Sequence, residues 1–197
     1  MWSAAILAGG RARRFGGRDK GALLVDGRPI LHRQIAELNT LTEDILIVGG
    51  PIRSPVPGPA RLVADQWPDR GPLAGVHAAL REARGDATVV IACDMPFVSA
   101  PLLAYLLALT GDADAVVPRT ELGYHPLCAA YTPACFAPAA ARLASGRLKM
   151  IDLFGDVRLR VVTTDEIDEF GDHNRLLANV NTPAEYDDLE AVQGHQL

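Results

Sequence analysis

The chain has 197 residues, of which 49% are hydrophobic and 22% charged, so it is long enough to bury one substantial hydrophobic core. Its net charge of −5 argues against broad binding to nucleic acid or anionic membranes, because both attractions need an excess of Lys and Arg. No apolar stretch is long enough to cross a bilayer and no secretory signal is visible, so we expect one cytoplasmic domain over residues 1–197.

The first predicted strand, residues 3–8, runs into a loop that gathers glycine and positive charge. Residues 9–20 hold four glycines and five cations: Gly9, Gly10, Gly16, Gly17, Arg11, Arg13, Arg14, Arg18 and Lys20. Backbone N–H groups of such a loop can contact phosphate, and the cations can offset its charge. We therefore predict an anion-binding loop, with a solvated surface loop as the alternative. Neither GxGxxG nor a Walker loop fits, since Gly21 follows Lys20 where a Walker loop has Ser or Thr.

Apolar runs rich in β-branched residues recur along the chain and alternate with stretches of helical spacing. Strands are predicted over residues 44–49, 87–93, 113–118 and 157–162. The helical faces between them are formed by Leu31, Ile35 and Leu38 and by Leu73, Val76 and Leu80. This alternation predicts an α/β fold around a mostly parallel sheet. The three cysteines, Cys93, Cys128 and Cys135, lack CxxC spacing, so neither a disulfide framework nor a zinc site is indicated.

Local signals mark several helix starts and two less regular segments. Pro72 suits the first turn of a helix, Ser99 can cap the next helix, and Thr182 opens a capping-box pattern. Residues 121–133 predict a strand pair that stands outside the main alternation. Residues 51–62 contain too much proline for a central strand and predict a loop.

The glycine-rich loop is part of a longer stretch, LAGGRARRFGGRDK at residues 7–20, that resembles a family signature. That signature, LAGGxxxRxGxxDK, is typical of the molybdenum cofactor guanylyltransferases, also called molybdopterin-guanine dinucleotide synthases. Blocks similar to those of this family follow in order: GPLAG at 71–75, CDMP at 93–96, HP at 125–126 and NVNTPAEY at 179–186. The resemblance implies a single three-layer, Rossmann-like nucleotidyltransferase domain. Its N-terminal part would bind the nucleotide and its C-terminal part molybdopterin.

The resemblance also implies which residues bind the nucleotide and which are catalytic. The implied nucleotide-binding residues are Leu7, Ala8, Gly9, Gly10, Lys20, Asp65 and Asp94. The first three would line the base and sugar, and Gly10 would lie near the phosphates together with Arg14. Lys20, Arg14 and Asp94 are the implied catalytic residues, with Lys20 holding the triphosphate and stabilising charge that develops at the α-phosphate.

Asp94 is the implied magnesium ligand. It follows a predicted buried strand, so its carboxylate should emerge at the carboxyl edge of the sheet, where a hard oxygen ligand can share Mg²⁺ with phosphates. A helix cap is the structural alternative for Asp94, and a turn is the alternative for Asp65. Near Val48 the family often has an asparagine, but this chain has IVGG, which removes one nucleotide contact or moves it to the backbone of Gly49 and Gly50.

Three residues are assigned by resemblance to the molybdopterin side. Asn179 and Asn181 carry amides that can pair with a polar pterin, and His125 is placed near the same substrate. Ordinary loop chemistry is the alternative for the asparagines, and an X-Pro turn is the alternative for His125.

The implied reaction is transfer of GMP from GTP to the terminal phosphate of molybdenum-molybdopterin, with Mg²⁺ as cofactor and pyrophosphate as the leaving group. LAGG and PLAG favour guanine over the CTP-dependent sister group. A sugar-phosphate nucleotidyltransferase is disfavoured by Asp19 before Lys20, and a cofactor carrier or nucleotide sensor by the presence of both Lys20 and Asp94. The resemblance further implies contact with a molybdenum-inserting protein and with chaperones of apo-molybdoenzymes.

Overall fold

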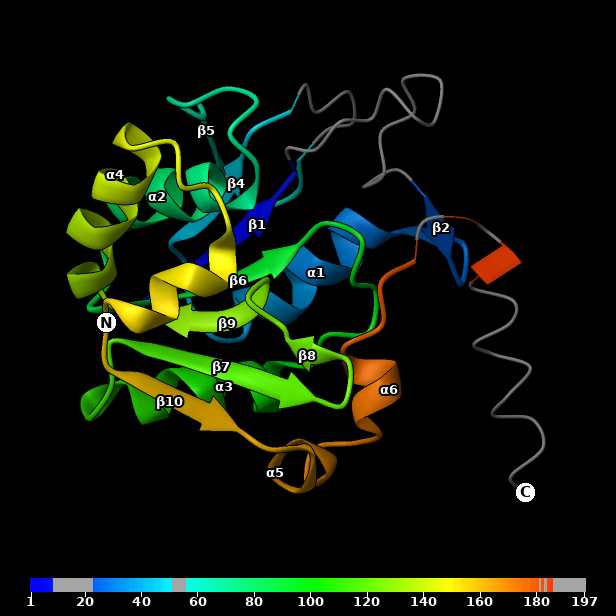
Figure 1. Ribbon diagram of the computed structural model, residues 1–197. Coiled ribbons are helices and arrows are strands. Elements are labelled where there is room, and N and C mark those ends of the chain that lie inside the picture. Colours follow the sequence, from blue (N-terminus) through cyan, green and yellow to red (C-terminus); the bar gives the residue numbers. More distant parts are fainter. Residues whose placement is uncertain (9–22, 51–55, 181, 183, 186–197) are drawn as a thin grey trace.

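A computed structural model describes residues 1–8, 23–50, 56–180, 182 and 184–185 (Figure 1). In this part of the chain an 8-stranded sheet has the order β10-β7-β9-β6-β1-β4-β5, with β8 paired to β7. Its strands are β1 (Trp2–Leu7), β4 (Ile45–Val48), β5 (Arg61–Val63), β6 (Ala87–Ala92), β7 (Ala115–Thr120), β8 (Gly123–Tyr124), β9 (Cys128–Tyr131) and β10 (Leu159–Val162). The β6-β1-β4-β5 portion is parallel, as is the β10-β7 pair, whereas β9 runs antiparallel to both β6 and β7. The predicted mostly parallel α/β sheet is confirmed.

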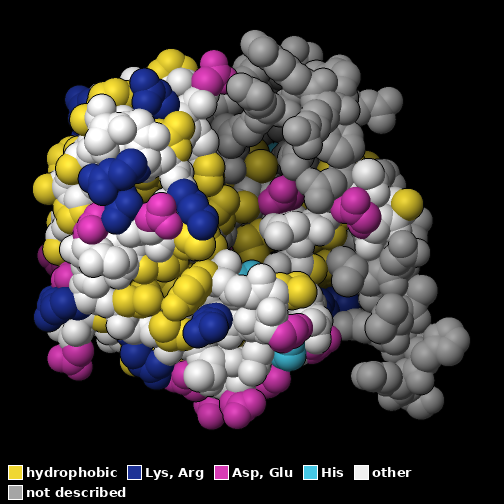
Figure 2. Space-filling model, viewed as in Figure 1, with side chains coloured by type: hydrophobic (Ala, Val, Ile, Leu, Met, Phe, Trp, Pro, Cys, Tyr) yellow, Lys and Arg dark blue, Asp and Glu magenta, His cyan; other side chains and the backbone are white. Residues whose placement is uncertain are grey.

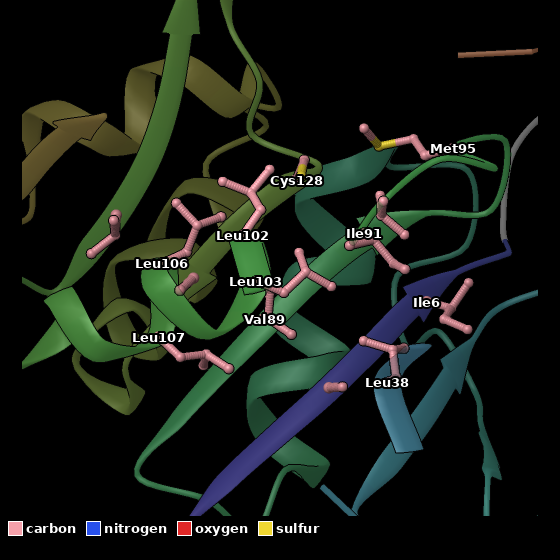
Figure 3. Packing of buried hydrophobic residues seen from close by; sticks show 14 of the residues in the cluster. Ile6, Leu38, Val89, Ile91, Met95, Leu102, Leu103, Leu106, Leu107 and Cys128 are labelled. Carbon is pink, nitrogen blue, oxygen red and sulfur yellow. The ribbon is translucent and has the colours of Figure 1, made fainter. Parts of the chain in front are cut away.

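Helices cover both faces of this sheet and complete three layers (Figure 1). One face is covered by α1 (Ile30–Asn39), α3 (Ala100–Ala108), α5 (Thr164–Asp168) and α6 (His173–Leu176), and the other by α2 (Pro72–Glu82) and α4 (Phe136–Ala144). Figure 3 shows leucines of α3 packed against Val89 and Ile91 of β6. Residues on both faces of β1 are buried, with Ile6 on one side and Leu7 on the other, so the stretch from Ala4 to Leu7 is continuously apolar.

The predicted helix starts are mostly confirmed. Pro72 lies in the first turn of α2, and Thr182 Oγ1 accepts a hydrogen bond of 3.2 Å from the Glu185 backbone N–H. Ser99 occupies the N-cap position of α3, but its hydroxyl makes no capping bond. The Glu37 carboxylate of α1 instead accepts from the Ala100 N–H at 2.8 Å. A side chain distant in sequence therefore caps α3, which local pattern alone did not predict.

Two segments differ from their predictions. Residues 121–133 do contain two strands, β8 and β9, but β9 does not stand outside the sheet, because it lies between β6 and β7. In the proline-rich stretch, Arg61 and Leu62 belong to the edge strand β5 rather than to a loop. An edge position suits such a stretch, since an edge strand pairs on one side only. Residues 51–55 of this stretch lie outside the described part of the chain.

A small hairpin lies at the far end of the glycine-rich loop. It pairs β2 (Leu24–Val25) with β3 (Arg28–Pro29) through a turn in which Asp26 and Gly27 both have positive φ, 49° and 70°. Such a turn is typical of two-residue hairpin loops. Val25 of the hairpin packs with residues from three other segments in a small apolar cluster formed by Val25, Ile30, Phe97 and Val180. None of the described helices is both long and apolar enough to cross a membrane.

Candidate functional site

The carboxyl ends of β1, β4 and β6 meet at one edge of the sheet. The Ala8 N–H donates to the Val48 carbonyl at 2.9 Å, and the Cys93 N–H donates to the Leu7 carbonyl at 3.2 Å. These bonds continue the parallel pairing of β1 with β4 and β6 past the ends of the strands. Leu7 and Ala8, two predicted nucleotide-binding residues, are therefore fixed at the point where the glycine-rich loop begins.

Gly49 and Gly50 follow β4 and form a tight turn against the end of β1. Both have positive φ, 76° and 66°. A Cβ atom on Gly50 would lie 2.8 Å from the Ala8 carbonyl oxygen, so only glycine allows this approach. The turn borders an open pocket of about 460 Å³, which is lined by Gly49, Gly50, Leu62, Val63, Ala64 and Asp65. Figure 2 shows that the surface is hollowed near the centre of the viewed face, where hydrophobic and acidic side chains gather.

Asp65 lines this pocket and also shapes its own loop. Its Oδ1 accepts a hydrogen bond of 2.8 Å from the Trp67 N–H, which is an Asx turn. The turn expected as the structural alternative is thus present. The Asx turn uses only Oδ1 of the carboxylate, and the half-buried Asp65 still lines the pocket. Asp65 can therefore form this turn and also contact a ligand.

Asp94 is half-buried in the turn that directly follows β6. Three other segments hold this turn. The Leu7 carbonyl accepts from the Cys93 N–H, the Val180 N–H donates to the Asp94 carbonyl at 2.7 Å, and Gln34 Nε2 of α1 donates to the Ala92 and Met95 carbonyls at 2.7 and 3.0 Å. The Asp94 carboxylate therefore sits on a well-fixed backbone at the carboxyl edge. A single hard oxygen donor in such a place fits Mg²⁺, which is usually bound by one or two carboxylates plus substrate phosphates.

Asn179 is exposed, and it lies next to the Asp94 turn because the N–H of the following residue, Val180, donates to the Asp94 carbonyl. His125 lies in the turn between β8 and β9, where its Nε2 is 2.9 Å from Thr120 Oγ1. Burial lowers the pKa of His125, although Glu121 acts in the opposite direction. The His125 turn reaches the same edge through Leu127, whose carbonyl accepts from the Ala92 N–H at 2.9 Å.

The remaining predicted residues lie outside the described part of the chain. They are Gly9, Gly10, Arg14, Lys20 and Asn181, together with the other glycines and arginines of the loop. Leu7, Ala8, Asp94 and Asn179 do come together, and Asp65 lines the adjoining pocket.

Sequence reasoning missed two residues that hold this edge, Gln34 and Val180. Gln34 left a weak signal, because it is a polar residue on the apolar stripe of a predicted helix beside Leu31 and Ile35. Val180 gave no signal of its own, since it acts through a backbone N–H. Among the described residues, one group with metal-ligating side chains lies elsewhere, at α5 and α6, where Asp168 pairs with His173 at 2.9 Å and Asp172 caps α6. These contacts account for that group structurally.

Known proteins resemble the chain over most of its length. A family model described as "MobA-like NTP transferase domain" matches residues 4–157. The chain is 35% identical over 181 residues to a Pelotomaculum thermopropionicum protein named "Probable molybdenum cofactor guanylyltransferase", which covers 91% of this chain and 87% of that protein. It is 30% identical over 188 residues to the "Molybdenum cofactor guanylyltransferase" of Desulfosudis oleivorans, with 95% and 93% covered.

A solved structure supports the same fold. Molybdopterin-guanine dinucleotide biosynthesis protein A from Archaeoglobus fulgidus superposes with a TM-score of 0.80 at 23% identity, covering 98% of this chain and 99% of that one. The shared fold, the match to the family model and the full-length relatives agree with the strand-end geometry described above. The chain therefore belongs to the family of MobA-like NTP transferase domains.

Proposed function

We propose that the protein transfers GMP from GTP to the terminal phosphate of molybdenum-molybdopterin and releases pyrophosphate. The observation that carries this proposal is the fixed Asp94 turn beside the end of β1, in a chain of this family whose relatives are named as molybdenum cofactor guanylyltransferases. In the reaction, an oxygen of the terminal phosphate forms a bond to the α-phosphorus of GTP. The bond from that phosphorus to the β-phosphate oxygen breaks, and pyrophosphate leaves.

Catalysis would depend on positioning and charge rather than on a general base. The second ionisation of a phosphate monoester has a pKa of about 6, so the attacking phosphate is already anionic near neutral pH. Asp94 would hold Mg²⁺, which when bound offsets the negative charge of the triphosphate. Lys20 and Arg14 would contact the phosphates from the glycine-rich loop, with Gly9 and Gly10 allowing close approach of the backbone.

The pocket beside β4 and β5 would receive the guanosine part of GTP. Leu7 and Ala8 would line the base and sugar where the end of β1 meets the Gly49-Gly50 turn, and Asp65 would contact the nucleotide from the lining of the pocket. The Gly49-Gly50 turn would supply backbone groups at the place where, by the resemblance, the family often has an asparagine side chain. The close contact between Gly50 and Ala8 supports this assignment, because it ties the turn to the proposed base-binding residues.

The molybdopterin side would be formed by the C-terminal part of the chain. Asn179 is exposed next to the Asp94 turn, and His125 lies in the turn that adjoins β6. Asn181 completes this proposed set. Protein partners implied by the resemblance, a molybdenum-inserting protein and chaperones of apo-molybdoenzymes, belong to the same proposal.

The test is pyrophosphate release by the purified protein with Mg²⁺ and molybdenum-molybdopterin, offered GTP, CTP, ATP and UTP in parallel. We expect release with GTP and a fall of roughly 100-fold or more in Asp94→Asn, which weakens the proposed ligand of Mg²⁺, and in Lys20→Ala, which removes a cation that would stabilise the negative charge of the transition state. Asp112→Asn is the matched control, since Asp112 is an exposed carboxylate near the amino end of β7. Turnover with CTP alone would correct the base, and nucleotide binding without turnover would favour a carrier or sensor.

A further inference from the structure

Gln34 is a fully buried polar side chain on the apolar face of α1. Its exposed fraction is 0%, and its neighbours on the same stripe, Leu31, Ile35 and Leu38, all pack into the core. An apolar residue of similar length would fill this position without the cost of removing an amide from water. The reason for a glutamine here must therefore lie in its hydrogen bonds.

The amide of Gln34 is oriented by two backbone carbonyls. Nε2 donates to the Ala92 carbonyl at 2.7 Å and to the Met95 carbonyl at 3.0 Å, which uses both of its hydrogens. The reverse orientation would place the amide oxygen against two carbonyl oxygens, so these contacts fix the assignment. Oε1 has no hydrogen-bond partner among the described residues.

The two carbonyls that Gln34 binds lie on either side of Asp94. They enclose the turn from Ala92 to Met95, whose central carbonyl is held from another direction by the Val180 N–H. We propose that Gln34 is a positioning residue that fixes the Asp94 carboxylate for metal binding and phosphoryl transfer. This inference rests on the proposed function, because it takes Asp94 as the magnesium ligand.

A second contact of the same helix supports this role. Glu37, three residues after Gln34, accepts from the Ala100 N–H at 2.8 Å at the start of α3. Helix α1 therefore holds the segment between β6 and α3 at both ends, with Gln34 at the end that carries Asp94. The segment cannot shift as a unit without breaking bonds to α1.

The test compares Gln34→Met with Ser3→Ala. Methionine keeps the length and burial of the side chain but cannot donate. Ser3 is equally buried at the opposite edge of the sheet, where its hydroxyl accepts from the Gly85 N–H at 2.8 Å and donates to Asp44. Four quantities are measured for each protein: the Tm, the affinity for Mn²⁺ in the presence of a non-hydrolysable GTP analogue, and the kcat and KM with GTP.

We expect both variants to lower Tm, but only Gln34→Met to weaken Mn²⁺ binding, by roughly tenfold or more, as changes behind a metal ligand typically do. Its kcat at saturating GTP should fall with little change in KM for GTP. Unchanged Mn²⁺ affinity in Gln34→Met, or an equal loss in Ser3→Ala, would overturn the proposal. A wild-type protein that binds no Mn²⁺ with the nucleotide would also overturn it.

The variant Gln34→Glu provides a second test. Its carboxylate would face two carbonyl oxygens, whereas the protonated acid can still donate one hydrogen bond, so Mn²⁺ affinity relative to wild type should improve as pH falls. A constant ratio across pH would count against positioning through these carbonyls. Mn²⁺ binding does not require turnover, so it can be measured even in a protein that transfers no GMP. A wild-type protein that binds Mn²⁺ but transfers no GMP would refute the proposed function. The Mn²⁺ affinities of the variants would still decide whether Gln34 positions Asp94.

Discussion

His77 on α2 shows how a single buried side chain can link stability to pH. Its exposed fraction is 5%, its ring stacks on Phe136 with centroids 4.6 Å apart, and its Nδ1 has no hydrogen-bond partner among the described residues. Burial, reinforced by the positive charge of Arg81, lowers the pKa of His77 below its ordinary value, and Asp65 opposes this shift. The neutral ring is therefore the form that the fold accommodates.

This shift predicts a loss of stability in mild acid. Below pH 6.5, His77 binds protons more readily in the unfolded chain than in the folded protein, because its pKa is lower in the folded protein. The contribution of His77 to the free energy of unfolding is therefore complete above pH 6.5 and declines as the pH falls below this value. His77→Phe should keep the stacked ring and remove the titration. We expect the urea midpoint of the wild type to drop more between pH 7.5 and 5.5 than that of His77→Phe. Equal drops in both proteins would show that other groups carry the acid sensitivity.

At the scale of elements, the contact between the ends of β1 and β4 depends on the absence of a side chain at Gly50. Alanine there would meet the Ala8 carbonyl oxygen at 2.8 Å and would also have to adopt a φ of 66°. Gly27 in the β2-β3 turn offers a matched position, because its φ is 70° and nothing lies within 4 Å of an added Cβ. Alanine at Gly27 introduces backbone strain alone, whereas alanine at Gly50 introduces both backbone strain and a steric clash. Comparing the two variants therefore separates these effects.

We predict that Gly27→Ala costs about 1–2 kcal/mol of unfolding free energy, the usual penalty for a left-handed conformation. Gly50→Ala should cost more, because Ala8 must also move, and it should raise the KM for GTP by displacing a residue of the proposed base site. Urea unfolding and steady-state kinetics of both variants measure the difference. Equal stability loss with unchanged KM would show that the β1-β4 turn accommodates the methyl group and does not shape the nucleotide pocket.

Elements differ in how far the sequence determines them. Strands β1, β4 and β6 are buried on both faces, so each appears as a mostly apolar run, broken only by Ser3 in β1 and Thr88 in β6, and could be predicted. The antiparallel insertion of β9 between β6 and β7 depends on pairing across the chain, which a local pattern does not encode. The cap of α3 was missed for a similar reason, since the acceptor is Glu37 rather than the adjacent Ser99.

In the candidate site, too, some features could be predicted from local sequence and others depend on tertiary contacts. Asp94 could be placed from the strand that precedes it, because the end of a parallel strand defines the edge at which a side chain emerges. The residues that hold its turn come from α1 and from the segment around Val180, far away in sequence. Local pattern thus locates the proposed magnesium ligand, whereas the contacts that hold its turn depend on tertiary structure.

At the scale of the whole molecule, distant parts of the chain converge on the Asp94 turn. Val180 has an exposed fraction of 1% and packs with Val25, Ile30 and Phe97, so one cluster joins the hairpin, α1, the segment after Asp94 and the C-terminal part. The backbone N–H of Val180 then donates to the Asp94 carbonyl at 2.7 Å. Packing and hydrogen bonding of Val180 can be separated by two substitutions.

We predict that Val180→Ala lowers Tm but leaves Mn²⁺ affinity near that of the wild type, because it trims the packed side chain and keeps the N–H donor. Val180→Pro removes the donor as well, so the Asp94 carbonyl loses the hydrogen bond from this N–H, while the bonds that β1 and α1 make to the turn remain. Its Mn²⁺ affinity with the GTP analogue and its kcat should both fall further than its Tm change alone accounts for. If the two variants instead lose affinity in proportion to their loss of Tm, Val180 acts through packing, and the C-terminal segment stabilises the fold without orienting Asp94.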